Sequence, residues 1–350
     1  MTARSVPTAC GDADPAARVC PRRAVLASGG AAALALALAG VVPSAARAQG
    51  AAFPSKPVRI VVTFAPGGGL DVMARLVAKR LSERLGQQVV VENRPGAGGT
   101  IGAAAGAAAP PDGHTILASG NPEITGMPYL VDRLPYDPLR DLAPLVLVAY
   151  VPAVLVVHPG TLPVADVAAL IERAKREPVP IGTPGKGSPM HIALEILNAQ
   201  AGTKFVHTPY KGGGPAAQDV AAGQVGAAIV NLPPLRAHLA GGRIRALAVM
   251  QAERSPQLPD VPTLKEATGI DNVSAPSWFA FMAPSGVPAP IRAQLEGAIR
   301  EALGDAALAA QLTAAGMDVV ALPADRFDRV MRAESAANAQ AIRRFAITGE

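Results

Sequence analysis

From Val58 onward, short apolar runs alternate with segments whose apolar residues recur at helical spacing. Val58–Phe64 is typical of a buried strand, and Leu70–Leu85, after a glycine-rich loop, is typical of an amphipathic helix that ends at Gly86. The same order recurs with strands at His114–Ala118, Pro180–Gly182, Phe205–Thr208 and Ala227–Asn231. Such alternation predicts an α/β fold in which mainly parallel sheets are flanked by helices.

Two extended stretches interrupt this alternation and predict that the chain crosses twice between two lobes. Leu145–Val157 is a long apolar run broken by Pro152, and Ile244–Met250 is a second apolar strand much further along. A length of 350 residues fits two domains of about 100 to 200 residues each. We therefore expect residues 151–247 to form a lobe inserted into the other, which comprises residues 51–150 and 248–350, with a hinge at the paired crossing.

Residues 1–48 have the features of an export signal. Arg22-Arg23 precedes an apolar stretch, residues 24–42, and residues 46–48 have the small-x-small pattern of a cleavage site, so the mature chain would begin at Gln49. The twin arginine resembles that of a Tat signal, although Pro21 replaces the usual Ser or Thr, and a Sec signal fits equally well. An uncleaved membrane anchor is the alternative, because the apolar stretch is nearly long enough to span a bilayer.

This segment also holds most of the net charge and both cysteines. Of the net charge of +5, +3 lies in residues 1–48, which carry 5 Arg and 2 Asp, and the 27 basic and 25 acidic residues of the remainder nearly balance. No lysine- or arginine-rich block follows, so we expect no nucleic-acid partner. Because the cysteines are Cys10 and Cys20, disulfides, thiolate catalysis and cysteine-bound metals are excluded from the body of the chain.

The loop Phe64–Asp71 follows the first predicted strand and contains three consecutive glycines. In open parallel sheets, ligands bind beyond the carboxyl ends of the strands. Glycines let backbone N–H groups approach a ligand closely, and the start of the next helix adds the positive end of its dipole. The loop therefore favours an anion, most simply a carboxylate. The alternative, equally open, is a tight turn in which Asp71 interacts with the start of its own helix.

A second loop, Gly182–His191, also lies between a predicted strand and a helix. It differs from a nucleotide-binding P-loop, because Pro180 replaces the first glycine and Lys186-Gly187 lacks the Ser or Thr that should bind magnesium. What remains is a hydroxyl- and glycine-rich helix start, in which Ser188 caps the helix and can still contact an anion. His191 lies one turn further, where a surface position is the alternative to ligand contact.

Other motifs give little support to catalysis or to a cofactor. Gly96–Gly102 approximates a dinucleotide fingerprint, but Ile101 stands at the third glycine position and the acidic residue, Glu92, precedes the motif. The five histidines lack zinc-binding spacing, and there is no Gly-x-Ser-x-Gly motif. We therefore expect no enzyme, metal or cofactor, with an exported nucleotide-dependent enzyme as the alternative from another class.

A series of short motifs runs in one order from about Pro54 to Pro290. They are Phe53–Val62, Pro66–Asp71, Val91–Gly99, Leu134–Pro138 with Asp141–Pro144, Pro209–Gly213 and Leu258–Thr263. Their combination resembles the Bug family, the substrate-binding receptors of tripartite tricarboxylate transporters. The resemblance implies a two-lobed periplasmic-binding-protein fold of type II. It also implies a small carboxylate in the cleft between the lobes and delivery of that ligand to membrane permease subunits.

Carried over motif by motif, the resemblance implies which residues bind the ligand. The first loop would contribute Phe64, Pro66, Gly67, Gly68, Gly69 and Asp71, and the second loop Thr183, Gly185, Gly187, Ser188 and His191. Strand ends expected to border the cleft carry Ser119, Asn121, Tyr210, Lys211 and Asn231. Leu70 stands where Ser or Thr is common in the family, so the first loop lacks a hydroxyl there.

These observations together predict a periplasmic, monomeric protein that binds a small carboxylate and delivers it to a permease. A periplasmic sensor that presents its ligand to a signalling partner is the alternative within the binding class.

Overall fold

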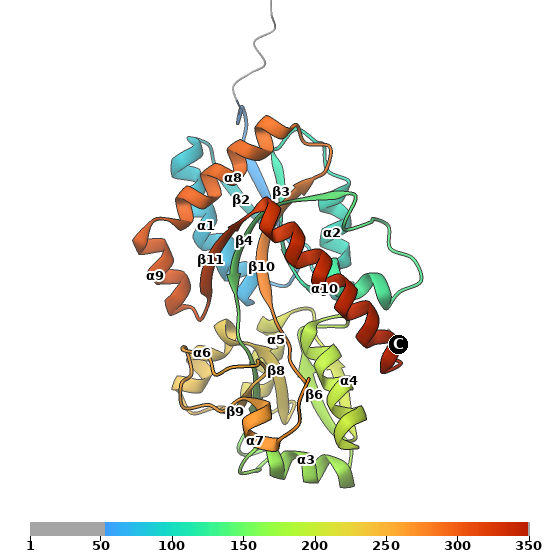
Figure 1. The fold of residues 1–350 in the computed structure, drawn as a ribbon. Helices are drawn as coiled ribbons and strands as arrows, with labels where there is room; N and C mark the ends of the chain where they lie inside the picture. The colour runs from blue at the N-terminus through green and yellow to red at the C-terminus, as the bar shows by residue number, and fades with distance from the viewer. Residues whose placement is uncertain (1–52, 349–350) are drawn as a thin grey trace, which may run out of the picture. The chain divides into compact units, whose positions relative to one another are not determined.

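Two β-sheets organise the part of the chain that the computed structural model describes, residues 53–348. Figure 1 shows the two sheets in separate lobes, each flanked by helices. The predicted two-lobed α/β fold is therefore confirmed. The predicted export signal, residues 1–48, lies outside the described residues. Within residues 53–348, no helix is both long and apolar enough to cross a membrane.

The first sheet has six strands in the order β11-β4-β10-β3-β1-β2. These strands are β1 (Val58–Val62), β2 (Val89–Asn93), β3 (Thr115–Gly120), β4 (Leu142–Tyr150), β10 (Trp278–Pro284) and β11 (Asp318–Pro323). β1 pairs in parallel with β2 and β3, whereas β10 is antiparallel to β3 and β4, and β11 is antiparallel to β4. The sheet is therefore mixed, with β1 to β4 running in one direction.

The second sheet has five strands in the order β7-β6-β8-β5-β9. They are β5 (Ala153–Val157), β6 (Val179–Thr183), β7 (Phe205–Pro209), β8 (Ala227–Asn231) and β9 (Arg245–Val249). β6 pairs in parallel with β7 and β8, and β5 is antiparallel to β8 and β9. Only β5 therefore opposes the direction that the other strands of this sheet share.

Helices connect and cover these strands (Figure 1). They are α1 (Gly69–Leu85), α2 (Thr100–Ala107), α3 (Val167–Arg176), α4 (Pro189–Ala201), α5 (Gly213–Ala221), α6 (Leu232–Ala240), α7 (Leu264–Thr268), α8 (Ala289–Leu303), α9 (Ala306–Ala314) and α10 (Ala324–Arg344). Shorter turns occur at Ala97–Gly99, Pro122–Gly126 and Met127–Tyr129. In β1, Val58, Ile60 and Val62 pack into one apolar cluster and Val61 into another. Because strand side chains alternate between faces, both faces of the sheet are covered.

The chain passes from the six-stranded to the five-stranded sheet between β4 and β5, where Pro152 interrupts the apolar run. It returns between β9 and β10. The expected boundary between residues 247 and 248 falls inside β9, which pairs with β5 through Val249. The inserted lobe that we propose therefore extends at least to Val249.

The last long helix, α10, contacts the cores of both sheets. Phe327 and Met331, in its first half, pack into the cluster on one face of the six-stranded sheet. Ile342, near its end, and Ile347, just beyond it, pack into a core cluster of the five-stranded sheet. Figure 1 shows α10 running from one lobe towards the other. Its middle section therefore lies where side chains can support loops between the sheets.

Candidate functional site

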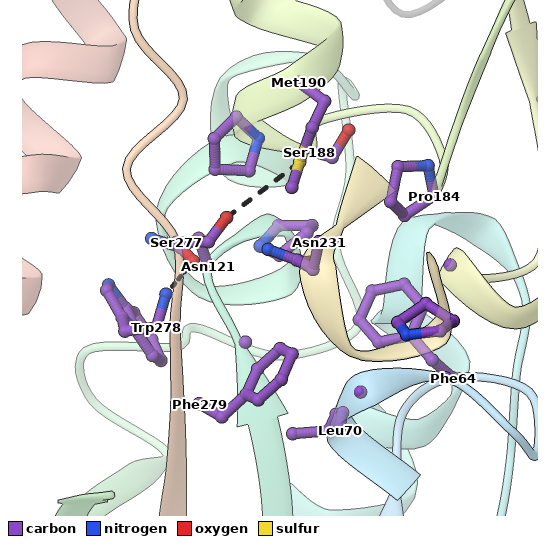
Figure 2. A pocket seen from close by; sticks show the side chains of 17 residues that line it. Phe64, Leu70, Asn121, Pro184, Ser188, Met190, Asn231, Ser277, Trp278 and Phe279 are labelled. Carbon is purple, nitrogen blue, oxygen red and sulfur yellow. Dashed lines mark hydrogen bonds between the residues drawn. The ribbon is translucent and has the colours of Figure 1, made fainter. Parts of the chain in front are cut away.

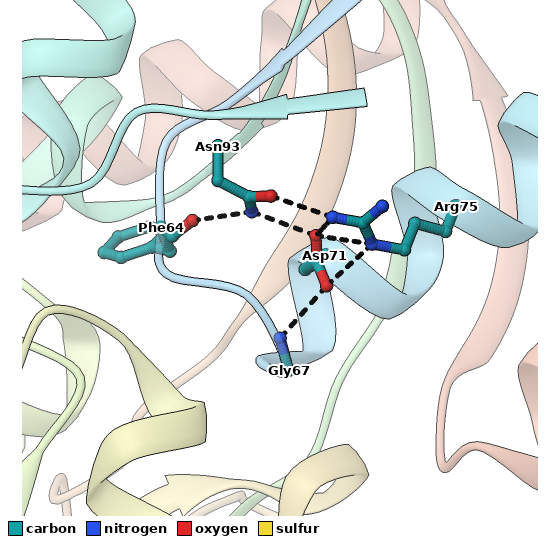
Figure 3. A network of polar contacts seen from close by, with 5 residues as sticks. All are labelled: Phe64, Gly67, Asp71, Arg75 and Asn93. Atoms are coloured by element: carbon teal, nitrogen blue, oxygen red, sulfur yellow. Dashed lines mark hydrogen bonds and ion pairs between the residues drawn. The ribbon is translucent and has the colours of Figure 1, made fainter. Parts of the chain in front are cut away.

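The loop after β1 is held in shape by the carboxylate of Asp71 (Figure 3). Asp71 Oδ2 accepts a hydrogen bond from the backbone N–H of Gly67 at 3.0 Å, and Arg75 and Asn93 donate to the same carboxylate at 3.0 and 2.9 Å. Asn93 Nδ2 also donates to the carbonyl of Phe64 at 3.0 Å. Burial raises the pKa of Asp71, but these hydrogen bonds and the charge of Arg75 lower it more, so the net pKa lies below its usual value. Asp71 therefore supports the loop.

The loop after β6 is likewise organised by its own side chains. Ser188 is the N-cap of α4: its Oγ accepts from the backbone N–H of His191 at 3.2 Å and donates to the carbonyl of Gly185 at 2.7 Å. Gly187 N–H donates to His191 Nδ1 at 3.2 Å, and Thr183 Oγ1 lies 2.7 Å from His207 Nε2. The predicted cap is confirmed, and it uses the Ser188 hydroxyl both as donor and as acceptor.

The starts of α1 and α5, which come from different lobes, lie close together. A Cβ built on Gly68, the N-cap of α1, would lie 3.5 Å from the backbone nitrogen of Gly214 and 3.8 Å from that of Gly213, at the start of α5. Nearby, Ala65 N–H donates to the carbonyl of Lys211 at 3.0 Å. The first N–H groups of a helix lack partners within the helix, and its N-terminus carries partial positive charge. The two positive helix ends therefore converge on one point.

A cleft opens beside this point and contains about 470 Å³ of space between atoms, part of it open to solvent. Loops and strands of both sheets contribute to its wall (Figure 2). The lining residues are Phe64, Gly68, Gly69, Leu70, Gly120, Asn121, Pro122, Pro184, Ser188, Pro189, Met190, Gly213, Asn231, Pro234, Ser277, Trp278 and Phe279. None of these lining residues is charged, so the positive helix ends are not neutralised by an acidic side chain of the wall.

Glu334, in the middle of α10, holds one wall of this cleft in place. Its Oε1 accepts from Asn121 Nδ2 at 2.6 Å and from Thr125 Oγ1 at 2.7 Å, and its Oε2 accepts from Trp278 Nε1 at 2.7 Å. Asn121 Oδ1 in turn accepts from the backbone N–H of Trp278 at 2.9 Å. Burial raises the pKa of Glu334 above its usual value, although these hydrogen bonds act in the opposite direction. Asn121 and Trp278 are thus fixed by a residue far along the chain.

A second hollow, of about 780 Å³ and partly open to solvent, shares Phe64 with the first cleft. It is lined by Gly96 to Gly99, Met127, Val131, Gly185, Lys186, Pro209, Tyr210 and Lys211. Burial, followed by a hydrogen bond to Asp219 and the charge of that residue, raises the pKa of Tyr210 to about 12. Unlike the first cleft, this second hollow therefore has lysine side chains, those of Lys186 and Lys211, in its lining.

His191 lies outside both hollows and stacks on His207, with ring centroids 4.0 Å apart and an angle of 18° between the ring planes. Burial, together with the charge of Lys186, lowers the pKa of His191 to about 4. Burial, followed by the charges of His191 and Lys186, lowers the pKa of His207 to about 3. Both rings are therefore neutral at neutral pH, and the pair borders a separate surface hollow beside the end of α10.

Ser119 supports the ends of two strands through Glu123, which is fully buried. Glu123 Oε1 accepts from Ser119 Oγ and Thr63 Oγ1, each at 2.7 Å, and from the backbone N–H of Gly120 at 3.0 Å. Its Oε2 has no hydrogen-bond partner among the described residues. Burial raises the pKa of Glu123, which favours the protonated form. The cluster joins the carboxyl ends of β1 and β3 below the cleft loops.

The structure divides the residues that the sequence singled out into three groups. Phe64, Gly68, Gly69, Asn121, Ser188 and Asn231 line the first cleft. Phe64, Gly185, Tyr210 and Lys211 line the second hollow. Pro66, Gly67, Asp71, Ser119, Thr183, Gly187 and His191 line neither. Several of this last group instead stabilise the loops that form the cleft.

The sequence analysis did not single out Met190, Ser277, Trp278 and Phe279, all of which line the first cleft. Met190 lies in the same loop as Ser188, so the motif could have predicted its place in the wall. Ser277 immediately precedes β10, and Trp278 and Phe279 begin it. This strand pairs with β3 across a long sequence separation. One usable signal was that Trp278 is the single tryptophan of the chain. Among residues 53–348, no cluster of three His, Cys, Asp or Glu side chains could hold a metal ion.

Comparison with known proteins places these features in a family. Residues 73–347 match the tripartite tricarboxylate transporter family receptor. Protein BugT of Bordetella pertussis (strain Tohama I) is 40% identical over 276 residues, covering 77% of this chain and 84% of BugT. A UPF0065 protein in the tcbD-tcbE intergenic region of Pseudomonas sp. (strain P51) is 39% identical over 285 residues, covering 81% of this chain and 82% of that protein.

Solved structures show the same fold. R. palustris Rpa4515 with adipate is 35% identical, with a TM-score of 0.80, and the match covers 85% of this chain and 99% of that one. MatC (Rpa3494) from Rhodopseudomonas palustris with bound malate is 30% identical, with a TM-score of 0.78 and coverage of 83% and 100%. The periplasmic binding protein BugD is 29% identical, with a TM-score of 0.80 and coverage of 85% and 99%.

Proposed function

The chain belongs to the Bug family of tripartite tricarboxylate transporter receptors, and from that membership we propose that it captures a small carboxylate outside the cytoplasm and delivers it to permease subunits. The adipate and malate held by the two R. palustris proteins support this ligand class. Capture and release need no chemical step, so the proposal includes no catalysis.

The observation that carries the proposal is the convergence of two helix starts at an uncharged cleft. The N-terminal ends of α1 and α5 approach each other at Gly68 and Gly213, and both glycines line the cleft. Unpaired N–H groups and partial positive charge at such ends favour a bound anion. Asp71, the acidic residue in the first turn of α1, already interacts with Arg75 and Asn93. A carboxylate is therefore the charge that complements this point.

The same geometry explains how binding would couple to closure of the lobes. α1 follows a strand of the six-stranded sheet, and α5 follows a strand of the five-stranded sheet. An anion held by both helix starts therefore makes contacts that are absent when the lobes separate. A ligand shifts a conformational equilibrium by its difference in affinity for the two states, so the carboxylate would favour the closed form.

Thermal denaturation of the purified protein with small carboxylates, NAD and ATP tests this function. Binding to the folded state alone, at about 100 times the dissociation constant, adds about 2.7 kcal/mol to the free energy of unfolding. We expect a higher melting temperature with at least one carboxylate and no change with either nucleotide. Stabilisation by NAD but by no carboxylate would contradict the proposal.

Export and delivery need separate tests. We expect N-terminal sequencing of the periplasmic protein to begin at Gln49, because residues 46–48 form a cleavage site after the apolar stretch. A full-length product in the membrane fraction would refute export.

Delivery is tested by uptake into vesicles that contain the permease. We expect these vesicles to accumulate the ligand only when the protein is added. Equal uptake with and without the protein would favour a sensor.

A further inference from the structure

The side chains that line the first cleft are mostly apolar (Figure 2). Nine lining residues are apolar, namely Phe64, Leu70, Pro122, Pro184, Pro189, Met190, Pro234, Trp278 and Phe279. Four have uncharged polar side chains, namely Asn121, Ser188, Asn231 and Ser277, and the other four are glycines. A wall of this kind complements a hydrocarbon or aromatic ligand body.

The polar side chains of the wall offer no opposite charge to a second charged group. Asn121 donates to Glu334 at 2.6 Å and accepts from Trp278 N–H at 2.9 Å, and the Ser188 hydroxyl is used twice in the cap of α4. Asn231 donates to the carbonyl of Val151 at 3.4 Å, and Ser277 lies 3.9 Å from Met190 Sδ. None of these groups is a cation, so none neutralises a carboxylate.

Recognition of charge is therefore confined to one end of the cleft. Gly68, Gly69 and Gly213 bring the helix starts to the lining, beside Leu70 and Phe64. Figure 2 places Phe64 and Leu70 in the lower right part of the cleft and Met190 with Ser277 in the upper part. A ligand whose carboxylate meets the helix starts directs its remaining atoms towards the apolar wall.

We propose that the cleft selects monocarboxylates with an apolar aliphatic or aromatic body over dicarboxylates and hydroxy acids. This inference rests on the proposed function, since it assumes that one carboxylate binds at the helix starts. A second carboxylate loses its hydration against the wall without gaining a charged partner, and a hydroxyl loses its hydration against side chains that are mostly apolar. Because this loss of hydration is not compensated, dicarboxylates and hydroxy acids should bind more weakly. The proposed selectivity would give this protein a different ligand class from the relatives that hold adipate and malate.

Isothermal titration with matched pairs of ligands tests the proposal on the unmodified protein. Hexanoate and adipate have the same chain length and differ only in the second carboxylate, and hexanamide removes the remaining charge. We expect hexanoate and phenylacetate to bind at least about tenfold more tightly than adipate or malate, and hexanamide to bind far more weakly than hexanoate. Adipate or malate binding as tightly as hexanoate would overturn the inference and leave the proposed function intact.

Two other outcomes bear on the proposed function itself. Hexanamide binding as tightly as hexanoate would show that the cleft does not recognise a carboxylate, and both proposals would fail. Absence of heat and of stabilisation with every acid in the set would have the same consequence. The failure of the selectivity is thus distinguishable from the failure of the function.

A pair of variants in one helix turn links the selectivity to the wall. Leu70→Thr replaces an apolar lining side chain with a hydroxyl, whereas Val72→Thr introduces the same side chain two residues away, outside the lining. We expect Leu70→Thr to weaken hexanoate binding several-fold and to reduce the ratio of the affinity for hexanoate to that for malate. Val72→Thr should leave both affinities unchanged. The melting temperature of each unliganded variant separates unfolding from loss of binding. Unchanged selectivity in a folded Leu70→Thr protein would overturn the inference.

Discussion

Gly68 stands at the start of α1, although its backbone conformation does not require a glycine. Its φ of −76° and ψ of 164° are accessible to any L-amino acid, unlike the φ of +79° at Gly67. A Cβ on Gly68 would make ordinary contacts, the shortest of them 3.5 Å, with Ala65 O and Gly214 N. Neither the backbone conformation nor the packing therefore requires glycine there. In the proposed function, the glycine lets a ligand approach the N–H groups closely.

Replacing Gly68 with alanine should therefore separate binding from stability. The added methyl group would stand in front of the α5 N–H groups, so we expect carboxylate affinity to fall at least about tenfold, which is about 1.4 kcal/mol. The melting temperature of the unliganded protein should change little. Gly297→Ala is the matched control, because a Cβ there meets nothing within 4 Å. Unchanged affinity in Gly68→Ala would mean that the anion does not sit at this helix start.

The stacked pair of His191 and His207 should make stability depend on pH. In the folded state the pKa values are about 4 and about 3, below the ordinary value of 6.5, because burial disfavours the charged rings. The unfolded chain therefore binds more protons below pH 6.5. Stability from the neutral pair is fully present above pH 6.5 and is lost as the pH falls towards 4. We expect urea denaturation to show a loss of stability across this range that is smaller in His207→Gln than in the unmodified protein. Equal losses in both proteins would show that the pair does not titrate as described.

At the scale of elements, α10 connects the cleft to both sheets. Its first half packs on the six-stranded sheet, its end packs on the five-stranded sheet, and Glu334 between them accepts hydrogen bonds from Asn121 and Trp278. The helix therefore acts on the cleft through a residue that does not line it. Glu334 is a positioning residue, because it orients two side chains of the wall.

Glu334→Gln should disturb both the wall and the stability of the protein. Glutamine has only one acceptor oxygen, so its NH₂ group would replace one of the two carboxylate oxygens. In one orientation the NH₂ group would face the donor Trp278 Nε1, and in the other it would face the donors Asn121 Nδ2 and Thr125 Oγ1. A mismatched buried hydrogen bond costs about 1–3 kcal/mol. Trp278 is the single tryptophan of the chain, so its fluorescence reports the change directly. We expect a shifted emission maximum and weaker ligand binding in Glu334→Gln. Asp328→Asn, which removes an exposed ion pair with Arg332 on the same helix, should have neither effect. An unchanged emission spectrum in Glu334→Gln would contradict the positioning role.

The elements themselves were predictable from the sequence to different degrees. The predicted strand at Val58–Phe64 and the helix at Leu70–Leu85 match β1 and α1 within two residues, because apolar periodicity reflects the burial of each face. α6 was missed, since Pro233 and Pro234 resemble a helix break although they occupy a first turn, where proline is tolerated. β10 was missed because its apolar run lacks alternation. Its antiparallel insertion between β3 and β4 depends on contacts that are distant in sequence.

The same distinction applies to the candidate site. Local motifs predicted the glycine-rich helix starts and the Ser188 cap, because backbone geometry and capping are local properties. They could not predict that Trp278 and Phe279 would join the cleft, since this follows from sheet pairing. Nor could they show that Asp71 would accept hydrogen bonds from Arg75 and Asn93. The hydrogen bond from Ser119 to Glu123 was equally beyond local motifs.

At the scale of the whole molecule, the two lobes meet through backbone as well as side chains. A Cβ on Gly98 would lie 2.6 Å from the carbonyl oxygen of Lys186, and a Cβ on Gly126 would overlap the carbonyl oxygen of Gly187. Gly98 and Gly126 belong to connections of the six-stranded sheet, and Lys186 and Gly187 to the loop after β6. The absence of side chains at these glycines therefore permits the close approach seen in this structure.

Gly126→Ala should open this approach without unfolding either lobe. The φ of −104° and ψ of −60° at Gly126 are tolerated by alanine, and the atoms nearest to the new methyl group belong to Gly187 in the facing loop. We expect small-angle X-ray scattering of the liganded protein to give a larger radius of gyration than for the unmodified protein, and carboxylate affinity to fall. Gly297→Ala again serves as the control. An unchanged radius of gyration and an unchanged carboxylate affinity in Gly126→Ala would show that close contact between Gly126 and Gly187 is not needed for capture.

We propose that one carboxylate is held between the starts of α1 and α5. A crystal structure of the protein with the most tightly bound acid of the titration set would locate that carboxylate. We expect its oxygens at hydrogen-bond distance, about 2.7–3.2 Å, from first-turn N–H groups of both helices, with the ligand body against Met190 and Trp278. An acid bound instead beside Lys211 in the second hollow, or with its carboxylate turned away from both helix starts, would contradict it.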